Sequence, residues 1–476
     1  MPRPPWHRTK IVCTLGPATD RAGVLERLIG AGMDVARFNM SHGDHAEHAR
    51  RIQQVRHLAR QMGQFVAVLV DLPGPKFRLG DLPDGARELR LGTDVVLALE
   101  ADLPDALPVR QPQLLQALRV GESVYLADGA IKLEVKTVGT DWVACQVIVS
   151  GTVTSGSGIN VPDSRLAALV PTDDDRRHLG FALAQQADWL GVSFVQSADD
   201  LIRVRALLPP GRQPLLMAKI EKRQALAELD AIVETADGVM VARGDLGVET
   251  DLAEIPLVQK RIIAVANARA RPVITATQML ESMVMQEQPT RAEVTDVANA
   301  MLDGTDGVML SAETAIGRFP VAAVEILQRV LTATETEYAA QLAADRLHAS
   351  GSAGNPMSLV ACQLAARLDA KAIIAPVSDM ATALEIPRFR PKAPLVVVAD
   401  SEDMCRRLAM VWGTSPLLAV TGLEPQSCLG LAGDWLRAQR LAQPGDPVVV
   451  LSTSDASQGE ADTLQVMRLP EDTSPG

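Results

Sequence analysis

Short apolar runs that end in polar residues recur between residues 10 and 313. They lie at 10–14, 33–39, 65–71, 187–194, 214–221, 237–245, 271–278 and 306–313. Near-continuous apolar strands are typical of parallel sheets that are covered on both faces. Helical patterns, for example at 45–63 and 258–270, lie between most of these runs. Eight strand-then-helix units predict an α/β fold, a (β/α)8 TIM barrel.

Two regions fall outside this pattern. The segment 76–163 has short strand-like pieces separated by turn residues, which predicts a small β-barrel or sandwich inserted as a lid on the larger barrel. From residue 339 onward, apolar strands alternate with helical segments, which predicts a C-terminal α/β domain with an open sheet. We therefore predict a catalytic barrel from 1–75 and 164–338, a lid from 76–163 and an α/β domain from 339–476.

Composition narrows the function classes. The net charge of −12 disfavours non-specific nucleic-acid binding, because a phosphate backbone attracts a basic surface. The five cysteines are scattered without a C-x-x-C pair, which fits a reducing cytoplasm better than a disulfide framework. The first residues lack the apolar core of a secretory signal, and no apolar run approaches the roughly 18–20 residues of a membrane span. We expect a cytoplasmic protein that binds neither nucleic acid nor membrane.

Polar residues gather where the predicted barrel strands end, which is where (β/α)8 barrels carry their chemistry. These ends carry Thr14, Arg37, Asn39, Ser41, Asp71, Ser193, Lys219, Glu221, Asp245, Thr277, Ser311 and Glu313. Two cations, several carboxylates and several hydroxyls would then surround one opening. Such a set suits a phosphoryl group and Mg²⁺.

Each part of this array also has a purely structural interpretation. Lys219 and Glu221 could form an ion pair at the barrel end, and Asp245 could cap a helix. Three histidines in 42–48 suggest zinc, but their spacing drifts around a helix and favours a solvated helix start, with His42 alone as a candidate ligand contact. The coincidence of all these polar residues at one barrel rim favours a functional site.

Six segments resemble the pyruvate kinase family in order and spacing, and the resemblance covers nearly the whole chain. The segments are 10–19, 32–43, 217–222, 237–249, 273–283 and 289–314, of which the last two together are highly specific. The resemblance implies a barrel with a β lid and a C-terminal regulatory domain. It also implies a cytoplasmic homotetramer that transfers phosphate from phosphoenolpyruvate to ADP, giving pyruvate and ATP in the last step of glycolysis.

The resemblance also implies roles for individual residues. Lys219 would neutralise the transferring phosphoryl group, and Arg37 would contact the phosphate. Glu221 and Asp245 would bind Mg²⁺, of which two ions would take part at turnover. Thr277 and the Gly244–Asp245 backbone would bind the pyruvate carboxylate, and Ser193 and Phe194 would line the pocket of the methylene group. Thr277 and Ser311 would deliver the proton to the enolate. The matches to nucleotide contacts are Pro17, Asn39, His42, Arg78 and Asp128.

One departure concerns the turn after the third strand. Many family members require potassium, bound near the matches of Asn39, Ser41, Asp71 and the Leu72 carbonyl, and carry a glutamate where this chain has Lys76. An ammonium group at that position supplies positive charge and repels potassium, because charges a few ångströms apart interact strongly in a partly dry cleft. We predict an enzyme that does not require potassium. The alternative is a solvated hinge lysine.

Two further departures concern the lid and the C-terminal domain. Ser157 stands where many relatives have a lysine that contacts the nucleotide. Residues 377–382, VSDMAT, replace the T-x-S-G-x-T loop that binds fructose 1,6-bisphosphate in some relatives, and Asp379 adds a negative charge there. We therefore predict no activation by this ligand in the usual way. A different phosphorylated effector, such as another sugar phosphate or AMP, stays open.

Two other functions compete with this one. A barrel aldolase would use Lys219 as a Schiff-base nucleophile or Mg²⁺ to stabilise a pyruvate enolate, but it explains neither the lid nor the C-terminal domain. A catalytically inactive metabolite sensor would bind its ligand through the C-terminal domain. Every expected catalytic position is filled, which disfavours the sensor.

Overall fold

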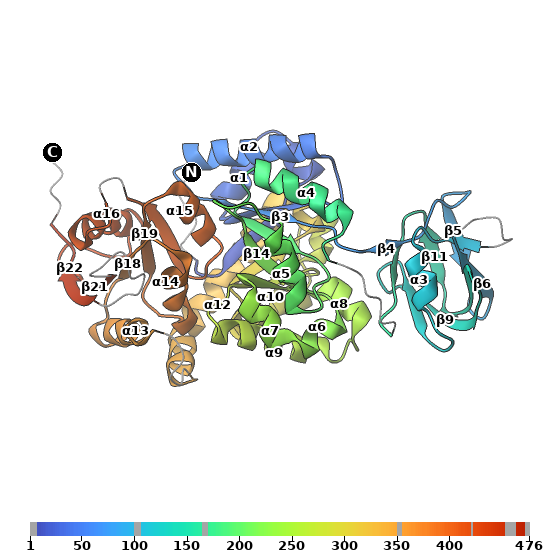
Figure 1. Cartoon of the computed structure of the whole chain (residues 1–476). Helices are drawn as coiled ribbons and strands as arrows, with labels where there is room; N and C mark the ends of the chain where they lie inside the picture. Colours follow the sequence, from blue (N-terminus) through green and yellow to red (C-terminus); the bar gives the residue numbers. More distant parts are fainter. Residues whose placement is uncertain are drawn as a thin grey trace.

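Three parts of the chain lie in a row, with the barrel between the lid and the C-terminal domain (Figure 1). The computed structural model describes residues 7–99, 106–163, 170–349, 355–419, 422–452 and 463–471. Residues 1–6, part of the segment on which the absence of a secretory signal was judged, lie outside the described residues, as does the predicted boundary at 164. The domain limits therefore stay predictions.

Eight parallel strands close into the central barrel, and all eight apolar runs predicted as barrel strands are confirmed. Strands β3 and β13 are neighbours in the barrel although the whole lid separates them in the sequence. The strands are almost entirely buried, which explains their apolar sequences. They are β1 (Lys10–Thr14), β2 (Val35–Asn39), β3 (Ala67–Asp71), β13 (Trp189–Val192), β14 (Leu215–Ile220), β15 (Gly238–Ala242), β16 (Val273–Ala276) and β17 (Gly307–Leu310).

Helices surround the barrel, and local sequence signals set their ends. Thr290 and Glu293 form a capping box at the start of α10, and Gly304 ends that helix at φ 97°. The outer helices are α1 (Val24–Gly30), α2 (His45–Gln61), α4 (Asp173–Ala184), α5 (Ala198–Ala206), α7 (Leu229–Thr235), α9 (Ile255–Ala268), α10 (Arg291–Asp303) and α12 (Pro320–Ala349). Shorter pieces are η1 (Pro17–Asp20), α6 (Arg223–Ala227), α8 (Arg243–Glu249), η2 (Glu281–Val284) and α11 (Ala312–Ala315).

The lid is a separate β domain with its own apolar core, as predicted. Seven strands form one sheet in the order β4-β12-β8-β9-β10-β6-β7, and β11 pairs with β5. A single bridge between Leu79 and Val109 joins the two edges of the seven-stranded sheet, so the sheet curls back on itself as a small barrel. The elements are β4 (Phe77–Arg78), β5 (Ala86–Leu89), β6 (Asp94–Ala98), β7 (Ala106–Pro108), α3 (Pro112–Ala117), β8 (Ser123–Leu126), β9 (Ile131–Val138), β10 (Trp142–Val149), β11 (Gly151–Thr154) and β12 (Gly158–Asn160).

The C-terminal domain is an open five-stranded sheet covered by helices, in the order β20-β19-β18-β21-β22. Four strands are parallel and β22 pairs antiparallel with β21. The elements are α13 (Pro356–Leu368), β18 (Ile373–Val377), α14 (Met380–Glu385), η3 (Pro387–Phe389), β19 (Leu395–Ala399), α15 (Glu402–Leu408), β20 (Thr414–Leu418), α16 (Pro425–Ala438), β21 (Pro447–Ser452) and β22 (Thr463–Arg468).

The barrel interior is filled at the end away from the lid. Inward side chains such as Trp189 and Met217 pack there with Ala409 and Met410, which follow α15 of the C-terminal domain. The C-terminal domain therefore closes one end of the barrel, and the end facing the lid is left for chemistry. Within the described ranges, no helix is both long and apolar enough to cross a lipid bilayer.

Candidate active site

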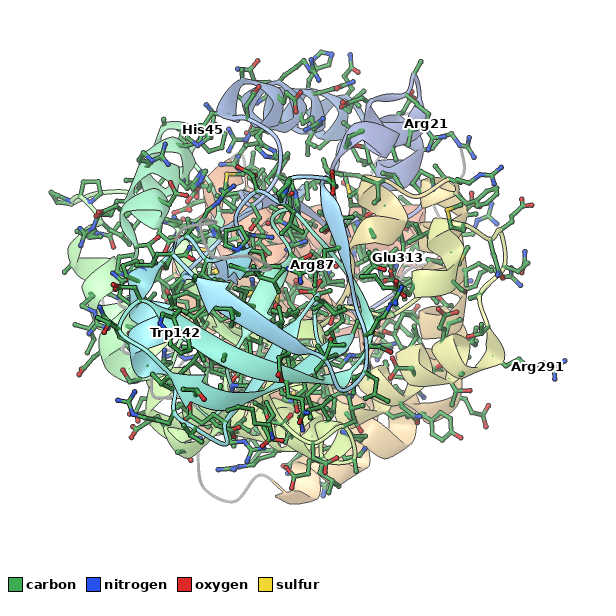
Figure 2. All side chains as sticks on the ribbon, turned by 90° about the vertical axis from the view of Figure 1, so that its right-hand side faces the viewer. Arg21, His45, Arg87, Trp142, Arg291 and Glu313 are labelled. Carbon is green, nitrogen blue, oxygen red and sulfur yellow. The ribbon has the colours of Figure 1, made fainter. Side chains whose placement is uncertain are left out.

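The lid stands in front of the barrel opening. Strand β3 ends at Asp71, and the chain passes through 72–76 into the lid, so the C-terminal ends of the parallel strands face it (Figures 1 and 2). In Figure 2 the lid, marked by Arg87 and Trp142, lies before a ring of barrel helices. The predicted catalytic side chains therefore share one enclosed face.

A buried lysine is the centre of this face. The Lys219 Nζ lies 3.1 Å from Asp71 Oδ1 and 3.0 Å from Glu221 Oε1, and it donates a 2.6 Å hydrogen bond to Ser193 Oγ. Burial alone would lower the pKa of Lys219, but Asp71 and Glu221 outweigh it and raise that pKa. The ammonium group therefore stays charged at neutral pH, as charge neutralisation of a phosphoryl group requires.

Asp71 holds the two cations of the site together. Its Oδ2 accepts a 2.7 Å hydrogen bond from Arg37 Nε and lies 2.7 Å from Arg37 Nη2, while Arg37 Nη1 donates to Thr14 Oγ1 at 2.8 Å. Burial would raise the pKa of Asp71, yet Lys219 and Arg37 lower it below its usual value. The aspartate at the end of this buried strand thus fixes the direction of both cations.

Glu221 is positioned by the backbone after β13. Its Oε2 accepts a 2.7 Å hydrogen bond from the amide of Phe194, a residue at φ 57°. Ser193 Oγ donates to the Leu72 carbonyl at 2.6 Å, which links this turn to the residue after β3. Burial raises the pKa of Glu221, Lys219 opposes the shift and the net direction is upward. The predicted Lys219–Glu221 ion pair is therefore present, and the ligand roles of these residues stay predictions.

Thr277 and Gly244 meet beside this cluster. The Gly244 amide donates to Thr277 Oγ1 at 2.8 Å, and Thr277 itself sits at φ 68°. Asp245 lies in the first turn of α8, whose N-cap is Ala242 without a side-chain cap, so the helix-cap alternative for Asp245 is wrong. Ser311 Oγ is buried and makes no hydrogen bond to the described residues, which leaves this hydroxyl available to a ligand.

Lys76 contacts different residues from those predicted for it. Its Nζ lies 3.1 Å from Asp128 Oδ1 on the lid and 3.2 Å from Asp245 Oδ1 on α8. The positive charge beside Asp71 comes instead from Lys219 and Arg37. Burial would lower the pKa of Lys76, but Asp245 and Asp128 raise it. Lys76 is thus an ion-paired residue at the lid hinge, and the alternative of a solvated lysine is wrong.

The predicted nucleotide contacts lie around the same opening. Burial, reinforced by Arg78, Arg37 and Lys76, lowers the pKa of His42, which places these cations near the imidazole. Arg78 ends β4, the first strand of the lid, and donates to the Gly156 carbonyl at 3.0 Å. Pro17 opens η1 after β1.

The predicted monovalent-cation ligands make local contacts. Asn39 Oδ1 accepts a hydrogen bond from the Ser41 amide at 3.1 Å. Asp44 caps α2, which confirms a helix start in the histidine-rich segment. The described residues include no group of three or more His, Cys, Asp or Glu side chains that could hold a metal.

The two departures from the family pattern have local explanations. Ser157 Oγ accepts from the Thr154 amide at 3.0 Å, so it shapes the turn between β11 and β12. Asp379 caps α14, with Oδ1 accepting from the Thr382 amide at 2.9 Å and Oδ2 accepting from the Thr382 hydroxyl at 3.0 Å. A carboxylate therefore occupies the start of α14, where it opposes an incoming anion.

Sequence reasoning missed two positioning residues. Arg243 Nη2 donates to the Thr277 carbonyl at 2.7 Å and its Nη1 lies 2.8 Å from Asp296, so it holds the turn at Thr277. Its place directly before Gly244 in a strand-end motif was the only signal. Asp175 accepts a 2.9 Å hydrogen bond from the Gly74 amide at the lid hinge, and nothing in the sequence connects the two.

Together these features define a phosphotransferase: buried cations around a carboxylate at the mouth of a TIM barrel, under a lid. The family model "Pyruvate kinase, barrel domain" matches residues 6–324, and "Pyruvate kinase, alpha/beta domain" matches 356–467. The chain therefore belongs to the pyruvate kinase family. The aldolase alternative does not explain these two matches together.

Individual relatives agree with this assignment. The chain is 39% identical over 471 residues to a pyruvate kinase of Geobacillus stearothermophilus, covering 97% of this chain and 80% of that protein. It is 40% identical over 473 residues to pyruvate kinase 2 of Synechocystis sp., covering 97% and 79%. The crystal structure of a pyruvate kinase from Cryptosporidium parvum is similar with a TM-score of 0.91 at 31% identity, covering 98% of this chain and 96% of that one.

Proposed function

We propose that this chain transfers the phosphoryl group of phosphoenolpyruvate to ADP in a Mg²⁺-dependent reaction that gives pyruvate and ATP, as the last step of glycolysis. The observation that carries the proposal is the buried Lys219 ammonium held between Asp71 and Glu221. Phosphoryl transfer depends on positioning and charge neutralisation more than on covalent catalysis. Lys219 and Arg37 supply two fixed cations that Asp71 keeps in place.

Glu221 and Asp245 are the residues that would hold Mg²⁺. Their carboxylate oxygens are the hard ligands that Mg²⁺ prefers, and two carboxylates plus substrate and water oxygens are its usual protein environment. When bound, Mg²⁺ offsets the negative charge of phosphate and enolate oxygens. We assign a second Mg²⁺ at turnover to the nucleotide phosphates.

The remaining polar groups orient the substrate and deliver a proton. Thr277 and the Gly244–Asp245 backbone would hold the pyruvate carboxylate, with Ser193 and Phe194 beside the methylene carbon. Thr277 Oγ1 already accepts from the Gly244 amide, so its hydroxyl is oriented. The Ser311 hydroxyl makes no hydrogen bond to the described residues and suits a proton relay through water to the enolate carbon.

The nucleotide would lie between the lid and the start of α2. Pro17, Asn39, His42, Arg78 and Asp128 are the proposed contacts. The lowered pKa of His42 favours a neutral imidazole at pH 7, which can donate or accept a hydrogen bond without adding charge.

Potassium independence is proposed from Lys76. In place of the glutamate that many family members carry, the lysine brings a positive charge to the lid hinge, where it pairs with Asp128 and Asp245 and not with the predicted potassium ligands. The remaining parts of the proposal are a cytoplasmic homotetramer and an effector, other than fructose 1,6-bisphosphate, on the C-terminal domain. The effector proposal rests on the Asp379 carboxylate at the start of α14.

The first test is an assay of phosphoenolpyruvate with ADP and Mg²⁺ in buffer without potassium or ammonium. We expect full activity there, little change on adding potassium, and a potassium requirement in Lys76→Glu. Lys136→Glu is the matched control, because Lys136 is an exposed lid lysine whose ion pair among the described residues is with Glu134. Strong potassium activation of the wild type would overturn the role of Lys76 but not the enzyme. Absence of turnover in both buffers would overturn the proposed reaction.

A further inference from the structure

One ammonium group ties the lid to the barrel. Lys76 follows the hinge turn 72–75, and its Nζ is shared between Asp128 on the lid and Asp245 on α8. The Lys76 side chain is 23% exposed and the Asp128 side chain 73%. Lid and barrel are far apart in the sequence here, so this contact exists only in the folded chain.

The surroundings of this contact are closely packed. A Cβ at Gly158 would lie 3.0 Å from Lys76 Cε, so a side chain there would press on the lysine stem beside β12. Gly129 is at φ 89°, and a Cβ there would lie 3.1 Å from a Val248 methyl group on α8. The lid turn at 127–129 thus rests directly on the helix that carries Asp245.

Asp245 differs from the other carboxylates of the site. Asp71 is held by Arg37 and Lys219, and Glu221 by Lys219 and the Phe194 amide. In the described part of the chain, Asp245 has its ion pair with Lys76 alone. Lys76 therefore contacts a site carboxylate with which Arg37 and Lys219 form no ion pair in the described residues. A cleft of about 620 Å³ between the lid and α8 adjoins it.

We propose that Lys76 is a metal-released latch: it occupies Asp245 and holds the lid until a divalent cation of the Mg²⁺ type displaces it. This rests on the proposed function, in which Asp245 is a metal ligand. An ammonium group and a dication on the same carboxylate repel each other, so each weakens the binding of the other by the same factor. Displacement leaves Lys76 paired with Asp128 on the lid and removes its ion pair with the barrel.

The metal arm of the test uses Mn²⁺ binding to the full chain without substrate, followed by electron paramagnetic resonance. We expect Lys76→Met to bind Mn²⁺ at least fivefold more tightly than the wild type, and Lys136→Met, which also removes one lid charge, to stay within twofold. Asp245→Asn should bind Mn²⁺ at least tenfold more weakly than the wild type. Unchanged binding by Asp245→Asn overturns the proposed metal site. Weakened binding by Asp245→Asn with unchanged binding by Lys76→Met overturns only the latch.

The lid arm separates a latch from a simple charge effect. All five cysteines are buried, so spin labels can be placed on cysteines introduced at Asp141 on the lid and Arg291 on the barrel. We expect Mg²⁺ to broaden the label distance distribution of the wild type, and Asp128→Asn to be broad already without Mg²⁺. The Asp128→Asn chain should not bind Mn²⁺ more tightly, because Lys76 still covers Asp245. A distribution unchanged by Mg²⁺ and by Asp128→Asn overturns the latch.

Discussion

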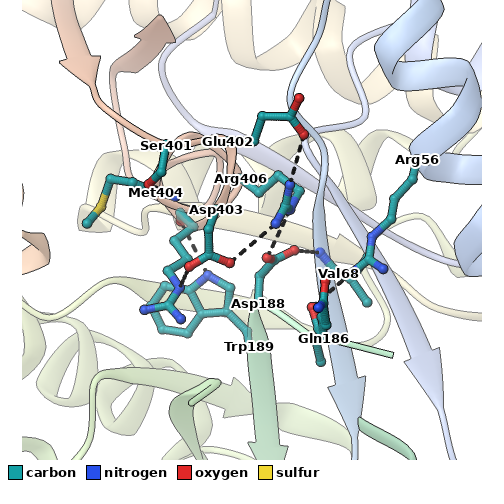
Figure 3. Close-up of polar contacts among 12 residues, drawn as sticks. Arg56, Val68, Gln186, Asp188, Trp189, Ser401, Glu402, Asp403, Met404 and Arg406 are labelled. Carbon is teal, nitrogen blue, oxygen red and sulfur yellow. Dashed lines mark hydrogen bonds and ion pairs between the residues drawn. The ribbon is translucent and has the colours of Figure 1, made fainter. Parts of the chain in front are cut away.

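Replacing Asp188 by asparagine should loosen the contact between the barrel and the C-terminal domain. Asp188 precedes β13, and its side chain is 0% exposed. Its Oδ1 accepts a hydrogen bond from Arg212 at 3.0 Å. The same Oδ1 accepts from Arg406 at 3.2 Å, and Oδ2 accepts from the Val68 amide at 2.8 Å (Figure 3). Arg406 lies on α15, so one buried carboxylate joins the two domains.

The size of the effect follows from what asparagine keeps and what it removes. Asparagine preserves the shape and an oxygen for the Val68 amide, but it removes the charge that faces two guanidinium groups. Burial raises the pKa of Asp188 even though Arg406 lowers it, so burying the Asp188 charge itself costs stability. The stability lost in Asp188→Asn therefore comes from Arg212 and Arg406, whose guanidinium groups lose their charged partner. Breaking a buried ion pair costs about 3–5 kcal/mol. Arg406 keeps Glu402 and Asp403, so we expect the lower end, about 3 kcal/mol.

Native-state hydrogen exchange measures this loss locally, which matters because a chain of three domains does not unfold in two states. The amides of Val68 and of α15 should exchange more than about 100-fold faster in Asp188→Asn, since each 1.4 kcal/mol is a factor of ten. Strand β9 of the lid serves as an internal reference.

Asp434→Asn is the control, because Asp434 pairs with Arg437 on the surface and such pairs are worth about 0–1 kcal/mol. Exchange in Asp188→Asn within twofold of the wild type, or equal to that of the control, would refute the reasoning. The network would then orient the domains without stabilising their contact.

Three further changes test the barrel. Lys219→Met should lower kcat/KM for phosphoryl transfer by about 10²–10³, because one preorganised charge is worth about 2.7–4 kcal/mol; a loss below tenfold contradicts its role. Gly74→Ala should lower the thermal midpoint more than Gly23→Ala, because both have φ near +70° but only at Gly74 would a Cβ lie 2.8 Å from two side chains after β13. Burial would raise the pKa of Asp34, but Lys10, His7 and the hydrogen bond from the Ile11 amide together outweigh it and lower that pKa. The stability deficit of Asp34→Asn, measured by urea unfolding, should therefore be complete at pH 6 and shrink below about pH 4. A deficit that is independent of pH contradicts this assignment.

Much of the architecture could be predicted because parallel strands that are buried on both faces have nearly continuous apolar sequences. The run 65–71 is apolar up to Asp71, and it ends as a barrel strand at that residue. The lid was predicted from its turn spacing, and the cluster of polar groups from the rule that strand ends share one edge. Lys219 lies on β14 and Glu221 follows the end of that strand directly, so their spacing of two residues was enough to predict that they pair.

Which charged side chains form ion pairs with one another depended on the tertiary structure. Which cation would meet Asp71 could not be predicted, because Arg37 and Lys219 lie on other strands and all three become neighbours only when the barrel closes. The sequence placed Lys76 at the lid hinge, but its contact with Asp245 spans 169 residues and depends on how the lid packs on α8. The sequence by itself therefore determined the strands, the domains and the chemistry at the strand ends, because periodicity and turn residues are local properties. Only the tertiary structure decided which charges pair, because Coulomb attraction acts between positions that the folded backbone brings within a few ångströms.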